Sequence, residues 1–491
     1  MNEAIGRLTR ICPVMGIFFY LLVVFGAMPR AEALELVGFD LSNQLEYSQN
    51  TEDDEETLEN WLDVNYRLDL LTTGLRYEAF QPSKSGQRKE EVSFLYFEAK
   101  KNDIALRGGD FYAMFGRGMV LRSYEDRDLR VDNKLTGVKI EGYYRGLEAT
   151  LLAGRPPQRD RDRADEVRGV DMNLQPAQGL SFGWSYVTLE APSVIGKGTE
   201  ISSLRIDAYP GPLSFYGELA KRTGHLGYGL YLSSSLALSG FAITAEMKDY
   251  DGMSLSTSDG LLEYNTPPAL TREHTYALFR RHPHELDAED EMGFQVESSL
   301  SPLEWTSVLL NYSYTAEHEK GSMQPTDHEL FGEYGRPLFR EAHVEVTQEI
   351  GEQASLIAAG GKSLAPGITN VTGVVDLSLY LDLLNSLRIE LQGQHTEEYG
   401  EYDDHQLTVE YTRAPRFSLS LVGERTNKSD LQKVPGEANN WLSVQIDLQL
   451  TDNHDATLFI GSRQAGFICT GGRCRWEPEF EGVEFKLFSH F

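Results

Sequence analysis

Charged side chains of both signs crowd the stretch 111–133, and they are the first residues of this chain whose chemistry suggests a site. Fixed cations and carboxylates that face each other across a water-filled opening create a transverse field, which orients polar solutes. The stretch also carries glycine and interrupts the strand pattern, so we expect a loop that folds inward and narrows a pore. The alternative is loop salt bridges at the surface, each worth about 1 kcal/mol or less. The candidate constriction residues are Asp110, Arg117, Arg122, Asp126, Arg127, Asp128 and Arg130.

A second group of basic side chains lies within residues 264–284. Its candidates for capping or lining a channel are Arg272, His274, Arg280 and Arg281. The run His282-Pro283-His284 invites a metal interpretation, because imidazole nitrogen is a common metal ligand. A proline between the two histidines and a loop-like setting make that pattern unspecific. We therefore predict neither a metal site nor a cofactor.

Cys469 and Cys474 flank the sequence Thr-Gly-Gly-Arg. A Gly-Gly pair is a hairpin signal that would place the two sulfurs on facing strands, and an exported chain meets an oxidising compartment. The sequence therefore predicts a disulfide, which would contribute roughly 2 kcal/mol by closing a short loop. A zinc site is disfavoured because two thiols supply only half of the usual ligands.

The elements that must position these residues show a two-residue period. Residues 442–450 alternate aliphatic side chains with Ser, Gln, Asp and Gln. A strand needs this pattern when one face meets hydrocarbon and the other meets water. The same alternation recurs at residues 62–70, 308–314, 387–391, 417–421 and 483–487. We predict an all-β fold: a transmembrane antiparallel up-and-down β-barrel of about 24 strands, within a range of 22–26.

Short and long connections alternate between these strands, as they do when one edge of a barrel carries tight turns and the other carries free loops. We expect short turns at 102–103, 145–146, 210–212, 385–386, 414–415 and 453–455, and long polar loops at 48–59, 155–167, 250–291, 317–327 and 424–440. Segments 250–291 and 328–350 leave the strand count open, and we take 111–133 and 250–291 as candidate inward or outer loops.

The bulk composition limits the class of protein. The mean hydropathy of −0.37 excludes a bundle of membrane helices but not a barrel, in which only every second strand residue faces lipid. A net charge of −30 is expected to repel nucleic acid. Residues 1–33 read as a signal peptide, because Arg7 and Arg10 precede an uncharged stretch and then Ala31-Glu32-Ala33. This leaves residues 34–491 as the barrel.

Two further features concern the family and the end of the chain. Residues 483–491 resemble the closing strand of outer-membrane proteins, whose terminal aromatic residue, here Phe491, is recognised by the barrel-assembly machinery. A family resemblance rests on three stretches of the sequence: the block from Gly109 to Met119 and on to Asn133, Asn265-Thr266-Pro267-Pro268, and Thr271-Arg272-Glu273-His274. Together they resemble an uncharacterised family of porin-like Gram-negative outer-membrane β-barrels. This resemblance implies a barrel in the outer membrane, with no assigned substrate or activity.

The function expected from the sequence is a porin-like channel for passive diffusion of small hydrophilic solutes, in contact with outer-membrane lipid and lipopolysaccharide. The polar faces of six strands hold more acidic residues than arginines, so the lumen is expected to favour cations over anions. These faces lie at residues 63–69, 205–207, 345–349, 388–390, 410 and 447. One alternative is a barrel that sheathes a partner such as an electron-carrying cytochrome, and a homo-oligomer is a further partner arrangement. Enzyme signatures are absent from the sequence, so we expect no enzyme, although a hydrolase built from scattered Asp, His and Ser stays an alternative.

Overall fold

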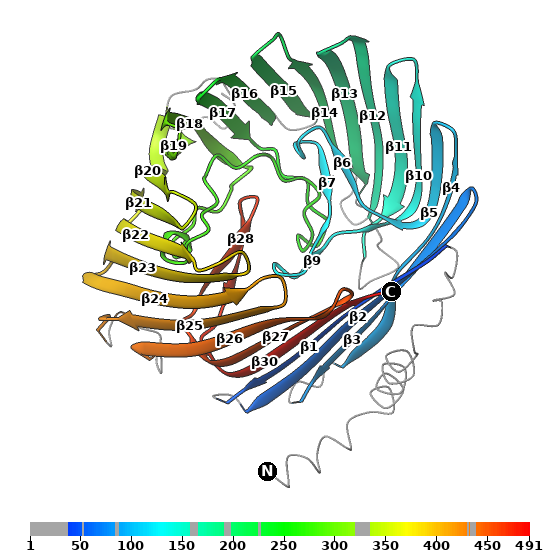
Figure 1. Cartoon of the computed structure of the whole chain (residues 1–491). Helices are drawn as coiled ribbons and strands as arrows, with labels where there is room; N and C mark the ends of the chain where they lie inside the picture. The colour runs from blue at the N-terminus through cyan, green and yellow to red at the C-terminus, as the bar shows by residue number, and fades with distance from the viewer. Residues whose placement is uncertain are drawn as a thin grey trace.

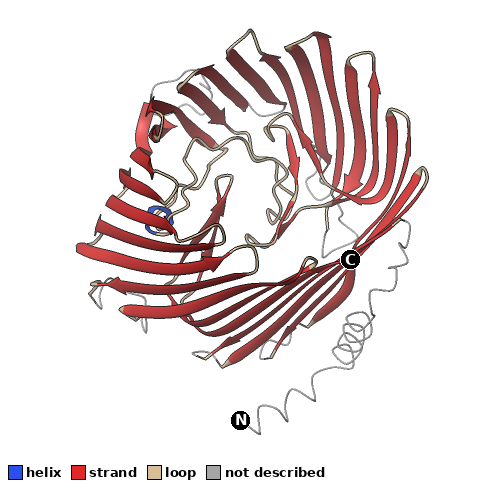
Figure 2. Ribbon diagram, viewed as in Figure 1, coloured by secondary structure: helices blue, strands red, loops and turns tan. Residues whose placement is uncertain are grey.

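The computed structural model describes residues 38–51, 54–83, 88–157, 165–190, 198–223, 227–319, 334–429, 432 and 438–491. The expected signal peptide lies outside these residues. A single 24-stranded antiparallel sheet closes on itself, because each wall strand pairs with the next along the chain and β1 pairs with β30 (Figures 1 and 2). The predicted up-and-down barrel of about 24 strands is confirmed.

The wall strands are β1 (Phe39–Asn50), β2 (Glu55–Leu68), β3 (Leu71–Pro82), β4 (Lys89–Lys101), β5 (Ile104–Phe111), β10 (Leu135–Tyr144), β11 (Leu147–Arg155), β12 (Glu166–Ala177), β13 (Leu180–Glu190), β14 (Thr199–Ala208), β15 (Leu213–Thr223), β16 (Tyr228–Leu238), β17 (Phe241–Asp251), β18 (Asp290–Leu303), β19 (Thr306–His318), β20 (Tyr334–Ile350), β21 (Ala354–Ala365), β22 (Ile368–Tyr380), β23 (Asn385–Glu397), β24 (Glu401–Arg413), β25 (Phe417–Thr426), β26 (Asn440–Thr451), β27 (His454–Arg463) and β30 (Phe480–His490).

Burial in the wall is inverted relative to a water-soluble protein. Leu204 and Leu442 are 64% and 67% exposed, whereas Ser203 and Ser443, their neighbours in sequence, are buried. Successive strand residues point to opposite faces, so the alternating sequence puts apolar side chains outside and polar ones in the lumen. An apolar outer face is typical of a barrel surrounded by hydrocarbon. Among the described residues, no helix has the length and apolar character needed to span a membrane.

The two rims of the barrel differ in their connections. The rim that holds the start of β1 and the end of β30, here the terminal rim, carries only turns of two to four residues. The opposite rim, here the loop rim, carries the longer connections. Three expectations were wrong. Residues 48–59 are mostly strand, because β1 and β2 pair up to Asn50 and Glu55. Asn385-Ser386 begins β23 after a turn at 381–384, and His454-Asp455 begins β27 after a turn at 452–453.

Among the described residues, three connections of the loop rim fold back inside the ring of strands, where Figure 1 shows β6, β7, β9 and β28. We call them inward segments A (112–134), B (252–289) and C (464–479). Segment A forms two small antiparallel pairs, segment B contains one short 3-10 helix, and segment C is a hairpin. Their elements are β6 (Ala113–Phe115), β7 (Leu121–Ser123), β8 (Glu125–Asp126), β9 (Val131–Asp132), η2 (Leu278–Arg280), β28 (Gly466–Thr470) and β29 (Arg473–Glu477).

Inward segments A and B share an apolar core with the lumen side of β10–β17. Phe115 and Met119 from segment A, and Tyr264 from segment B, belong to one buried cluster with wall residues such as Val187. The wall makes room for this packing at Gly169, where a Cβ would lie 2.7 Å from Cε2 of Phe115. This part of the lumen is therefore packed like the interior of a soluble domain.

Candidate pore constriction

Arg127 joins inward segment A to the wall strands β1 and β2. Its Nη1 donates to Oε1 of Gln44 at 2.7 Å, and its Nη2 lies 3.4 Å from Oδ2 of Asp63. The guanidinium carbon is 5.2 Å from the ring centroid of Trp61, which is within range of a cation–π interaction. The arginine therefore binds a polar and aromatic patch of the wall.

Glu125 completes a ring of alternating charges beside Arg127. Arg76 of β3 donates to Oδ1 of Asp63 and to Oε1 of Glu125, each at 2.6 Å. Nε of Arg127 lies 3.3 Å from Oε1 of Glu125. Burial alone would raise the pKa of Glu125, but the hydrogen bond and charge of Arg76, with a smaller effect of Arg127, lower it below the usual value. Glu125 is therefore a carboxylate at neutral pH.

The remaining candidates at the tip of segment A have different surroundings. Arg130 is exposed and its Nη2 lies 2.9 Å from Oε1 of Glu59. Asp126 accepts the backbone N–H of Leu129 at 2.9 Å, which holds the local turn. Asp128 is exposed and faces the lumen without a cationic partner among the described residues. Two carboxylates at this tip are thus not neutralised by arginine.

Three other predicted constriction residues serve to hold the structure together. Nη1 of Arg117 donates to the hydroxyl of Tyr231 at 3.1 Å, and its guanidinium lies 4.4 Å from the ring of Tyr216. The backbone N–H of Arg122 bonds to Tyr264 O at 2.7 Å, which joins segments A and B. Asp110 belongs to wall strand β5, where it accepts from the backbone N–H of Leu95.

The second group of candidates places segment B against the opposite wall. Nη1 of Arg272 lies 2.6 Å from Oε2 of Glu297, and Nε2 of His274 lies 2.9 Å from Oε1 of Glu341. Arg281 pairs with Oε2 of Glu424 at 2.9 Å and with Oδ2 of Asp404 at 3.3 Å, whereas Arg280 is exposed. Three of the four candidates therefore tie segment B to wall strands.

The histidine pair of segment B does not converge on one point. Nε2 of His282 lies 3.3 Å from the hydroxyl of Tyr402, and Nε2 of His284 lies 3.1 Å from Oε1 of Glu291. Burial lowers the pKa of His282; Glu398 opposes this effect and Lys428 adds to it. Within the described ranges, no group of three or more His, Cys, Asp or Glu side chains is placed to hold a metal ion.

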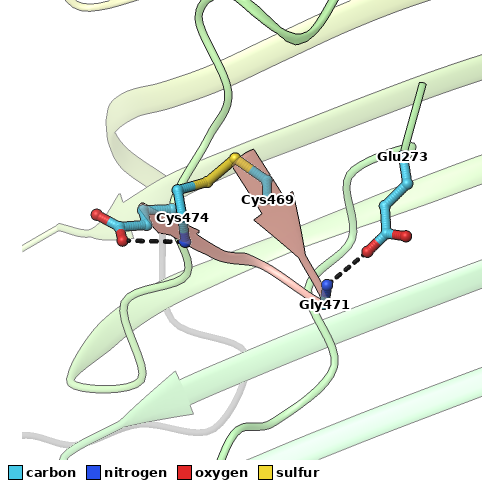
Figure 3. The surroundings of a disulfide bond; sticks show 5 residues. Glu273, Cys469, Gly471 and Cys474 are labelled. Carbon is cyan, nitrogen blue, oxygen red and sulfur yellow. Dashed lines mark hydrogen bonds between the residues drawn. A yellow bond between two sulfur atoms is a disulfide. The ribbon is translucent and has the colours of Figure 1, made fainter. Parts of the chain in front are cut away.

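Inward segment C is a hairpin closed by a disulfide between Cys469 and Cys474, which face each other across β28 and β29 (Figure 3). Its tip reaches segment B. The backbone N–H of Gly471 donates to Glu273, and Gly472 O accepts from the N–H of Leu286 at 3.0 Å. A Cβ on Gly472 would lie 2.5 Å from the Cβ of Ala269, so only glycine fits at this contact.

A polar cavity of about 610 Å³ lies between the tip of segment A, segment C and the wall strands β1–β3, β27 and β30. Its lining includes nine carboxylates and six cationic side chains, with Trp61, Tyr47 and Phe80 among the aromatic residues. A volume of this size accommodates a small solute. The cavity lies beside the constriction candidates of segment A, and not beside those of segment B.

Comparison with known proteins gives the family. A family model described as "Family of unknown function (DUF6029)" matches residues 31–491. The chain belongs to the DUF6029 family. No curated protein sequence matches it.

Several solved structures are similar to this DUF6029 chain at low sequence identity. The translocation pore of the P pilus usher PapC is 12% identical, with a TM-score of 0.47, and the match covers 92% of this chain and 99% of the usher chain. The siderophore receptor PirA from Pseudomonas aeruginosa is 10% identical, with a TM-score of 0.45 and coverage of 92% and 80%. OccD1 (OprD) is 10% identical, with a TM-score of 0.37 and coverage of 80% and 96%.

Two asparagines connect the inward segments of this DUF6029 chain through hydrogen bonds and were not predicted as functional residues. Nδ2 of Asn133 donates to Glu263 O at 2.7 Å, which joins segment A to segment B. Asn265 accepts from the N–H of Leu255 at 2.7 Å and donates to Met119 O at 3.0 Å and Met253 O at 2.6 Å. Both lie in the sequence blocks that carry the family resemblance, and this position was the signal that could have identified them.

We predict that Asn265→Leu loosens segments A and B without opening the wall. The substitution leaves three buried backbone groups without their partner, at a cost of at least about 2 kcal/mol. Limited trypsin digestion of the detergent-solubilised protein should then cut at Arg117 and Arg122 faster than in the unmodified chain. Asn265→Asp, which keeps the acceptor for Leu255, should be intermediate. Equal digestion of all three proteins would contradict the assigned role.

Proposed function

We propose that this chain is an outer-membrane channel through which small hydrophilic solutes diffuse passively. The observation that supports it most directly is the polar cavity of about 610 Å³ inside a wall whose outer face is apolar. Water-filled space lined by charged side chains lowers the cost of moving a polar solute across hydrocarbon. The inward segments narrow this space, which limits the size of the solutes.

The outer face fits a location in the outer membrane, in contact with lipid and lipopolysaccharide. Exposed apolar residues such as Phe97 and Leu391 would face the acyl chains. Phe491, which follows β30, would be read by the barrel-assembly machinery during insertion. Removal of Phe491 should reduce the amount of heat-modifiable protein in the outer-membrane fraction.

The sheath for an electron-carrying partner is the weaker proposal. A partner that runs through the barrel needs an unobstructed lumen, whereas segments A and B pack on the wall through a shared apolar core. Displacing them would expose that core to water. A channel needs no such rearrangement. Co-purification of a haem absorbance with the barrel would favour the sheath.

We predict that the channel prefers cations. The cavity lining holds nine carboxylates and six cations, so the local concentration of cations is raised. In a planar bilayer under a KCl gradient, the reversal potential should correspond to a potassium permeability about twofold or more above that of chloride. Asp126→Asn with Asp128→Asn should reduce the preference. A measured preference for chloride would reject the prediction.

A further inference from the structure

The wall patch of Gln44, Trp61 and Asp63 already holds a guanidinium group, the one on Arg127 of inward segment A. It supplies an amide oxygen at 2.7 Å, a carboxylate oxygen at 3.4 Å and an aromatic ring whose centroid is 5.2 Å away. An acceptor, a negative charge and a π face are the groups that bind a planar guanidinium best. The wall therefore presents a guanidinium site, and the chain fills it from within.

Arg127 is the weakly held member of its charge ring. The two carboxylates of the ring, Asp63 and Glu125, each accept a 2.6 Å hydrogen bond from Arg76. Nη2 of Arg127 lies 3.4 Å from Oδ2 of Asp63, and its Nε lies 3.3 Å from Oε1 of Glu125. The single short hydrogen bond of Arg127 goes to the neutral amide oxygen of Gln44. Removing Arg127 therefore leaves no buried carboxylate unpaired, because Arg76 stays in place.

The site is accessible from the lumen. Trp61, Glu125 and Arg127 all line the cavity of about 610 Å³. The side chain of Arg127 is 27% exposed. At the same tip, Asp126 bonds to a backbone N–H and Asp128 is exposed, so a second cationic group of a solute would find carboxylates that arginine has not neutralised.

We propose that this patch binds solutes that carry a guanidinium group, by exchange with Arg127. The proposal rests on the channel function and names the solute class that its cavity accepts. In the resting chain, Arg127 holds the tip of segment A against the wall together with the Arg76–Glu125 and Arg130–Glu59 pairs. A solute that takes the place of Arg127 on Trp61 and Gln44 removes one of these three contacts.

The test is calorimetric titration of the detergent-solubilised full chain with L-argininamide. Arg127→Gln vacates the patch, so the solute no longer competes with an internal guanidinium, and its affinity should rise by about tenfold or more. L-citrullinamide, which has the same shape without the charge, should not bind to either protein. L-lysinamide should bind more weakly than L-argininamide, because an ammonium group does not match the planar site.

Two further variants test whether the gain in affinity needs the Trp61 ring and whether it is specific to position 127. Arg127→Gln combined with Trp61→Leu removes the ring and should abolish the gain in affinity. Arg168→Gln makes the same change of charge on β12, at a side chain that pairs with Glu166 and Glu190 and does not line the cavity, and should match the unmodified chain. Heat-modifiable migration of each variant shows that the barrel is folded.

The proposal is overturned if Arg127→Gln leaves the affinity for L-argininamide unchanged, or if L-citrullinamide binds equally well. Titration is independent of conductance, so the two proposals fail separately. Binding without ion conduction would reject the channel function and leave the site in place. Conduction without this binding would reject the site and leave the channel function in place.

Discussion

Replacing residues 466–477 by a short glycine–serine turn will raise the single-channel conductance about threefold or more, because a barrel of 24 strands encloses a wide lumen once its inward segments loosen. The change removes the hairpin of inward segment C and keeps wall strands β27 and β30. Ile468, Arg475 and Glu477 of this hairpin line the cavity, so their loss enlarges it directly.

The hairpin also holds segment B in place. Its tip bonds to Glu273 and Leu286, the N–H of Cys474 donates to Oε1 of Glu285 at 3.3 Å, and Arg473 pairs with Glu263. These contacts spread over more than twenty residues of segment B. Without them, segment B keeps its bonds to the wall but loses its support on the side of the cavity.

A matched variant tests whether the conductance depends on the presence of the hairpin or on its cross-link. Cys469→Ser with Cys474→Ser keeps the hairpin and removes the cross-link, which costs roughly 2 kcal/mol of loop-closure free energy. We expect a mean conductance near that of the unmodified chain with more frequent openings, and the same effect from a reductant. If the shortened chain conducts no better than the unmodified one, segment C does not restrict the lumen.

Lys248→Met will destabilise the barrel by about 3–5 kcal/mol, because it leaves a buried carboxylate without its cation. Lys248 of β17 and Glu291 of β18 form an ion pair whose side chains are both fully buried. Glu291 also accepts from the backbone N–H of Asp287 at 2.7 Å and contacts His284, so it ties the end of segment B to the wall.

The double variant Lys248→Met with Glu291→Gln is the control. It removes both charges and keeps an acceptor for the N–H of Asp287, so most of the lost stability should return. Urea titration in detergent micelles, read by the heat-modifiable band, measures the free energy of unfolding of all three proteins. If the double variant is as unstable as the single one, packing at this position, and not the unpaired charge, explains the loss.

The sequence alone determined the closed sheet, because alternation along a strand reports which face meets hydrocarbon. Leu442–Leu450 shows this, and β26 has Leu442 outside and Ser443 inside. The disulfide was also local information, since Cys469 and Cys474 flank a tight turn. Alternation fails beyond the apolar belt, where both faces meet water. The polar end of β1 and the acidic start of β2 around residues 48–59 therefore looked like a loop, although they are paired strands.

Only the tertiary structure decided the partners of the inward segments. Arg127 meets Gln44, 83 residues earlier, and Arg281 meets Glu424, 143 residues later. Nothing in the sequence of segment C predicted that this hairpin folds into the lumen. Sequence periodicity encodes the direction of each side chain relative to its own strand, whereas a contact across the lumen depends on how the ring closes and where a loop re-enters it. The charges at 111–133 therefore marked a candidate constriction, and closure of the barrel decided which wall residues they bind.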